Sequence, residues 1–100
     1  MKAYRHGDVI IVEIEKLPEG VKKLNHLVLA EGEVTGHKHQ IIKGDAELYE
    51  KDGRLYLRVI TPSVIDHPEH GQGVIEPGIY GVDKPQEFDY FKADYRRVRD

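Results

Sequence analysis

The stretch AELYEKDGRLYLRVI, residues 46–60, decides the fold. Polar and apolar side chains alternate on both sides of Asp52-Gly53, and such alternation is typical of a strand with one buried face. Asp-Gly between two strands suits a tight turn in which both residues have positive φ. The sequence therefore predicts a β-hairpin, with strands at 46–50 and 54–60.

The rest of the chain shows the same pattern of short apolar runs interrupted by glycine, proline and aspartate. A β-branched run over 9–14 predicts a strand, and 79–82 predicts another. We expect a third strand to begin at 27–30 and to run on through Glu33 to Ile42. No stretch has a convincing helical period. Residues 1–100 therefore predict one all-β domain, closed as a small barrel or a jelly-roll-like sandwich, which hides the edges of the strands.

Composition narrows the class of protein. The chain is 39% hydrophobic and 33% charged, which is typical of a soluble globular domain. Its net charge of −3 does not favour nucleic acid as a partner, although a nucleotide or another small molecule remains open as substrate. There are no cysteines, which points to the cytoplasm. The longest apolar run, Val9–Val12, is too short to cross a membrane, and no signal peptide is expected.

Six histidines are the chemically informative feature, because four of them form two close pairs. His37 and His39 lie two residues apart, and His67 and His70 lie three apart around Pro68. Imidazole binds metal ions and transfers protons near neutral pH. His6 and His26 lie in apparent loops and are expected to be solvated.

The spacing of each pair predicts a shared site. If residues 33–39 are extended, then Glu33, His37 and His39 share one face of a strand. A turn at Pro68-Glu69 would bring the second pair together. We expect His37, His39 and His70 to bind a divalent transition metal, such as zinc, iron or manganese, since the chain offers no sulfur ligand. His67 is the candidate fourth ligand or proton shuttle.

Other candidate groups are less specific. Glu33 or Glu69 is a candidate metal ligand, a candidate partner that orients a ligating histidine, or a candidate general base. The segment Arg96–Arg99 offers guanidinium groups that could hold a phosphate, although an exposed terminal segment is the simpler interpretation. Gly7-Asp8 is treated as ordinary turn chemistry, with a catalytic aspartate as the alternative.

Much of the chain resembles a group of small uncharacterised prokaryotic and phage proteins. The resemblance rests on Gly7-Asp8-Val9, Leu29–His39, His67-x-x-His70-Gly71, Pro77-Gly78-x-Tyr80 and Arg96-Arg97-Val98. Pro68 departs from the pattern of that group. It implies a shared site and no particular substrate.

A partial resemblance to the cupins, which hold a metal inside a jelly-roll barrel, rests on the order Gly32, His37, His39, Glu47 and Gly53. Glu47 lies too far along the chain for that motif, and Tyr80 stands near the place of the later histidine. The cupin resemblance implies a metal role only for His37 and His39.

Three functions remain open from the sequence. The first is a metal-dependent hydrolase or oxidoreductase acting on a small substrate. The second is a metal-free phosphodiesterase or nuclease that uses paired histidines as general acid and base. The third is a non-catalytic module that binds a ligand or a protein, and a homo-oligomer is compatible with all three.

Overall fold

The computed structural model describes residues 2–32 and 34–83, and all ten of its regular elements are strands. Their bounds are β1 Ala3–His6, β2 Val9–Ile14, β3 Lys22–Lys23, β4 Val28–Glu31, β5 Lys38–Lys43, β6 Ala46–Lys51, β7 Arg54–Val59, β8 Ser63–His67, β9 Gly71–Ile75 and β10 Gly78–Asp83. The predicted all-β class is confirmed. The described residues contain no helix long and apolar enough to cross a membrane.

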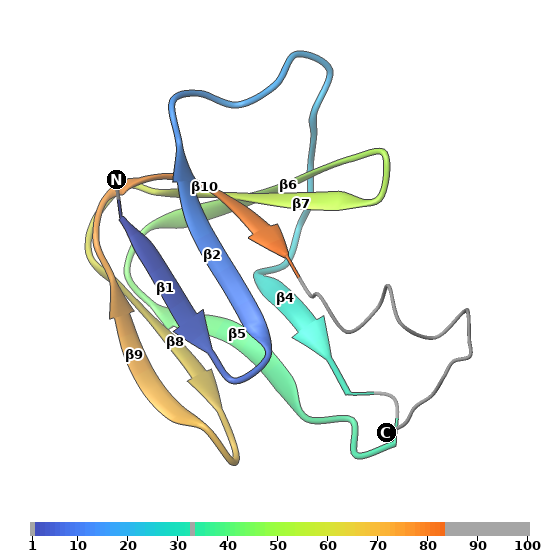
Figure 1. Ribbon diagram of the computed structural model, residues 1–100, viewed down its shortest axis with the longest axis vertical. Coiled ribbons are helices and arrows are strands. Elements are labelled where there is room, and N and C mark those ends of the chain that lie inside the picture. Colours follow the sequence, from blue (N-terminus) through green and yellow to red (C-terminus); the bar gives the residue numbers. More distant parts are fainter. Residues whose placement is uncertain (1, 33, 84–100) are drawn as a thin grey trace.

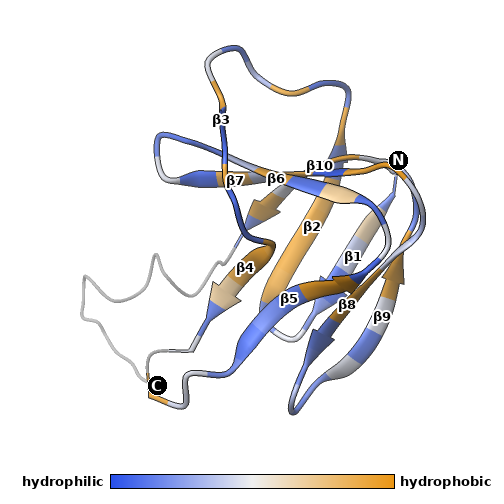
Figure 2. Ribbon diagram, turned by 180° about the vertical axis from the view of Figure 1, so that it is seen from behind, coloured by the Kyte–Doolittle hydropathy of each residue, from blue (hydrophilic) through white to orange (hydrophobic). Residues whose placement is uncertain are grey.

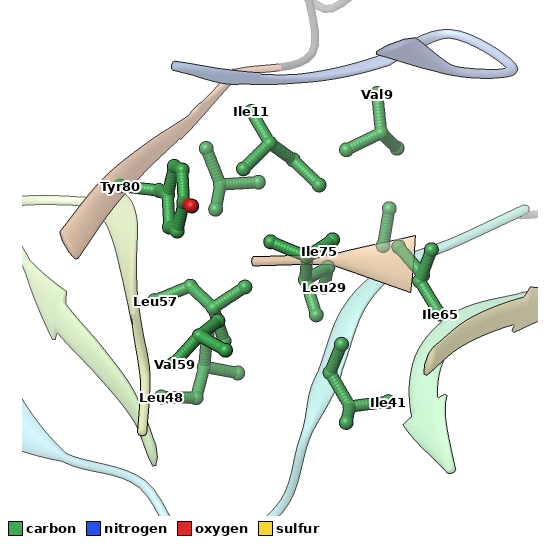
Figure 3. Packing of buried hydrophobic residues seen from close by; sticks show 12 residues of the cluster. Val9, Ile11, Leu29, Ile41, Leu48, Leu57, Val59, Ile65, Ile75 and Tyr80 are labelled. Atoms are coloured by element: carbon green, nitrogen blue, oxygen red, sulfur yellow. The ribbon is translucent and has the colours of Figure 1, made fainter. Parts of the chain in front are cut away.

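The strands form two antiparallel sheets (Figure 1). The first has the order β1-β2-β10-β7-β6-β3 and the second the order β4-β5-β8-β9. Side chains from both sheets meet in one hydrophobic core, as Figure 3 shows for Ile11 of the first sheet and Ile65 of the second. The architecture is therefore a small β-sandwich.

The predicted hairpin is confirmed as β6 and β7. Lys51 pairs with Arg54, which leaves Asp52 and Gly53 as a two-residue turn. Their φ values are 52° and 83°, and positive φ at both positions is what such a turn requires. The turn chemistry of the sequence thus sets the register of this hairpin.

The single strand expected through Glu33 to Ile42 is wrong. The chain instead forms β4 and β5, which pair antiparallel on either side of a reversal. Gly36 has a φ of 73°, and its N–H donates to the carbonyl of Gly32 at 2.9 Å. The N–H of Gly32 in turn donates to the carbonyl of His37 at 2.9 Å. These bonds close the loop, and strand parity therefore does not extend from residue 33 to residue 39.

Candidate metal centre

Five of the six histidines meet at one end of the sandwich. The β1–β2 and β8–β9 turns both lie at this end, which is the lower end in Figure 1. The ring centroids lie 4.2 Å apart for His39 and His67, 4.6 Å for His67 and His70, and 5.6 Å for His37 and His67. His6 completes the cluster, with its ring centroid 5.0 Å from that of His39. We call these five residues the histidine cluster.

The alternation of strand side chains places two members of the cluster. On β5, His39 and Ile41 are buried while Lys38 is exposed, and on β8 Ile65 and His67 are buried. His39 and His67 are therefore the inward-facing residues of β5 and β8 that lie nearest this end of the sandwich, and they continue the row of core side chains. The ends of β5 and β8 that carry them are hydrophilic, whereas the rest of each strand is largely apolar (Figure 2).

His70 is held beside His67 by the turn that the sequence predicts around Pro68-Glu69. The Nδ1 of His67 accepts hydrogen bonds from the backbone N–H groups of Glu69 and His70, at 3.0 and 3.2 Å. The turn ends at Gly71, which has a φ of 75° and pairs with His67. The side chain of His67 thus stabilises the β8–β9 turn that positions His70.

Ring nitrogens of His39, His67 and His70 lie within 4.8 Å of one another. Zinc binds imidazole nitrogen at about 2.0–2.1 Å, so two nitrogens on one tetrahedral ion lie roughly 3.4 Å apart. Small side-chain rotations would bring this group to that spacing. His39 and His67 are buried, and His70 is exposed.

His37 approaches the cluster from the loop before β5 and not from a strand. Its backbone N–H donates to Oγ1 of Thr35 at 3.1 Å. Its Nδ1 is buried and makes no hydrogen bond within the described chain; the nearest carboxylate oxygen, Oε2 of Glu69, lies 3.9 Å away. A buried nitrogen with an unused bonding capacity is compatible with a metal ligand.

The expectation that His6 is solvated is wrong. It is the inward-facing end of β1 and is only 8% exposed. Its Nδ1 lies 2.9 Å from Nδ1 of His39, and its Nε2 lies 2.9 Å from the carbonyl oxygen of Gly71. The signal in the sequence was the alternation from Tyr4 to His6, which shows only if β1 is recognised as a strand. His26 is exposed, as expected.

Two acidic side chains lie beside the cluster. Oδ1 of Asp8 lies 3.6 Å from Nε2 of His39, so the Gly7-Asp8 turn contributes to the site as well as to the fold. The carboxylate of Glu69 faces His37. Both acidic side chains are more than half exposed. Glu33 and the Arg96–Arg99 segment, which the sequence marks as candidates, lie outside the described residues.

The environment favours uncharged imidazoles. Burial, together with the neighbouring His67 and His6, lowers the pKa of His39 to about 4. Burial and the neighbouring His70 also lower the pKa of His67. Neutral imidazole is the form that binds a metal ion, so His39 does not need to lose a proton to bind one at neutral pH.

The fold and the site together define a small β-sandwich with a histidine cluster at one end. The chain belongs to the family described as a domain of unknown function (DUF8820), whose model matches residues 5–84. All five histidines of the cluster lie within the matched region. No curated protein and no solved structure matches the chain.

Proposed function

We propose that the histidine cluster binds a divalent transition metal ion and that the protein is a metal-dependent enzyme. The observation that carries the proposal is that ring nitrogens of the proposed ligands His39 and His70 lie within 4.8 Å of each other, with a nitrogen of His67 within the same distance of both. Packing alone rarely collects buried imidazoles, since each must satisfy two polar nitrogens. The acidic Asp8 beside the group adds a charge that favours a cation.

The hydrogen bonds of His67 give this residue a role different from that of the proposed metal ligands. Its Nδ1 accepts from two backbone N–H groups, so a neutral His67 carries its proton on Nε2. A protonated nitrogen cannot coordinate a metal. We therefore assign His39 and His70 as ligands, and His67 as a residue that donates a hydrogen bond through Nε2–H to a group bound at the ion. His37 is the candidate third ligand, because its Nδ1 makes no hydrogen bond within the described residues.

The donor set indicates the class of metal. It holds imidazole nitrogens and nearby carboxylates and no sulfur, which suits zinc, iron(II) or manganese. Such an ion supplies an activated water or polarises a substrate oxygen, and iron also supplies redox chemistry. The exposed side chains of His70, Asp8 and Glu69 leave the site open to solvent, which favours a small molecule or a nucleotide as substrate. The cysteine-free chain supports action in the cytoplasm.

Metal analysis tests the proposal directly. Protein purified without a histidine tag should bind close to one zinc or iron(II) ion, measured by calorimetry and elemental analysis. His39→Ala and His70→Ala should abolish binding, and His26→Ala, outside the cluster, is the matched control. His67→Gln should retain the ion, whereas equal loss in this variant would reassign His67 as a ligand. Wild-type protein that binds no transition metal would refute the proposal.

One observation favours a second candidate function, metal-free acid–base chemistry on a phosphodiester. The ring of His39, whose pKa is lowered to about 4, is a neutral base at pH 7, and the ring of His67, which would act as the acid in its protonated form, lies 4.2 Å away. This pair could act as general acid and general base. Activity on a model phosphodiester that survives chelation and shows a bell-shaped pH profile would support it. Loss of that activity on chelation would exclude it.

A further inference from the structure

We propose that His6 is a positioning residue that fixes the tautomer of His39, so that Nε2 of His39 is the nitrogen offered to the metal. The last step rests on the function proposed above. The first step concerns only the hydrogen bonds of the metal-free protein and can be tested without any ligand. His6 itself is not a ligand in this arrangement, because both of its nitrogens already have partners.

The direction of the hydrogen bonds follows from a single carbonyl. The backbone oxygen of Gly71 can only accept, so Nε2 of His6 donates to it across 2.9 Å. A neutral imidazole has one N–H, and Nδ1 of His6 must therefore accept. Its partner across 2.9 Å is Nδ1 of His39, which must donate. His39 then carries its proton on Nδ1, and the lone pair is left on Nε2.

The free lone pair lies on the ring nitrogen of His39 that is close to an acidic side chain. Nε2 of His39 is the atom that lies 3.6 Å from Oδ1 of Asp8, on the side where the cluster is open. Histidine ligands generally donate their other N–H to an acceptor, which sets the tautomer and orients the ring. A carboxylate or carbonyl usually accepts that proton. Here His6 accepts the hydrogen bond from His39, and His6 is itself held by its hydrogen bond to the Gly71 carbonyl.

The two hydrogen bonds form a relay from the Gly71 carbonyl through His6 to His39. This relay connects parts of the fold that do not pair as strands. His6 ends β1 in the first sheet, whereas His39 lies on β5 and Gly71 begins β9, both in the second sheet. Gly71 also ends the turn that carries His70. The carbonyl that orients His39 is therefore fixed to the loop of another proposed ligand, and the two nitrogens are positioned together.

The tautomers can be read by nitrogen-15 NMR of the histidine rings in metal-free protein near pH 8. The expected result is His39 with its proton on Nδ1 and His6 with its proton on Nε2. His6→Leu, which removes both bonds, should release His39 to the other tautomer or to a mixture. His6→Asn retains an oxygen near the position of Nδ1, and should keep the Nδ1–H form of His39.

Metal affinity is the second readout. His6→Leu should bind zinc about 10- to 100-fold more weakly, the usual cost of losing such a partner, while His6→Asn should stay close to wild type. A wild-type His39 with its proton on Nε2 would overturn the hydrogen-bond relay. If wild-type protein binds zinc and His6→Leu binds it equally well, the step from tautomer to metal affinity is overturned instead. If the tautomers are as expected and no variant binds metal, the relay stands and the proposed metal function fails.

Discussion

Gly7 contributes to the site through the side chain that it lacks. A Cβ built on this residue would lie 2.7 Å from Cδ2 and Nε2 of His70 and 3.0 Å from Cε1 of His39. Such distances are shorter than van der Waals contact, so one of the groups must move. His70 lies in an exposed turn and is the group with room to do so. The glycine thus permits the β1–β2 turn to pack directly on the imidazoles.

Gly7→Ala should therefore weaken zinc binding by more than its effect on stability explains. Alanine at a φ of 64° should cost about 1–2 kcal/mol in the free energy of unfolding. The displaced His70 ring should lower zinc affinity in addition, which calorimetry would measure. Gly53→Ala is the matched control, since its φ is 83° and nothing lies within 4 Å of the added atom. Equal zinc affinity in the two variants would contradict the steric argument.

The lowered pKa of His39 predicts how the metal-free protein responds to acid. An unfolded histidine titrates near 6.5, whereas His39 in the folded protein has a pKa of about 4. Between these values the unfolded chain binds more protons, so the free energy of unfolding falls as the pH drops from about 6.5 to 4. Urea denaturation with chelator present, at several pH values, would measure the slope.

The variant His39→Gln should show a shallower slope over the same range, because it removes the group whose protonation opposes folding. His67, whose pKa is also lowered, should leave part of the slope in that variant. A wild-type protein that is equally stable at pH 7 and pH 5 would contradict the expected burial of these imidazoles. His26→Gln is the control for an exposed histidine.

At the scale of the strands, the β6–β7 turn tests whether the turn residues themselves stabilise the hairpin. Gly53→Val should destabilise the protein by at least about 1–2 kcal/mol, because a β-branched residue is strained at a φ of 83°. Gly73→Val is the control, since Gly73 lies within β9 and an added Cβ would make ordinary contact with Ile65 at 3.7 Å. Thermal or urea denaturation would compare the two. Equal losses would contradict the turn argument.

The elements that could be predicted are those whose signals are local. The hairpin at Asp52-Gly53 and the β-branched strand over 9–14 carry their own turn and strand signals, and both were predicted nearly to the residue. The reversal at Gly36 was missed because isolated glycines in an apolar pattern do not show whether the chain bends or pairs. β1 was missed because an edge strand with alternating polar residues is recognised mainly by its partner.

The sequence predicts part of the site correctly, but the strand from which it derives that prediction does not form. The sequence predicts that the two histidine pairs meet, and the rings do lie together. The expected cause, one strand from Glu33 to His39, is wrong; His39 is placed by alternation along β5, and His37 arrives by a loop. His6 and Asp8 could not be assigned from the sequence, because only the packing of the β1–β2 turn brings both beside His39, and His6 beside Gly71 as well.

At the scale of the whole molecule, metal binding is expected to add stability to a domain that is already folded. The core lies between the sheets and is built from apolar side chains, so it does not depend on an ion. Free metal at about a hundredfold excess over its Kd should raise the free energy of unfolding by about 2.7 kcal/mol. Thermal denaturation with zinc and with chelator would measure the gain.

His39→Ala should lose that gain and remain folded, which separates metal binding from a general effect of zinc. Complete unfolding of the wild-type protein on chelation would contradict this expectation. It would instead support the third function left open by the sequence, in which the ion serves as a structural staple.

The continuity between core and histidine cluster leaves the site exposed on its outer side, where Asp8, Glu69 and His70 lie. His39 and His67 extend the inward rows of β5 and β8, so the apolar core lies directly behind these two imidazoles. Any exchangeable ligand on a bound ion must then occupy the same face. Azide and phosphate should therefore compete for the ion, which displacement of bound azide by added phosphate would measure.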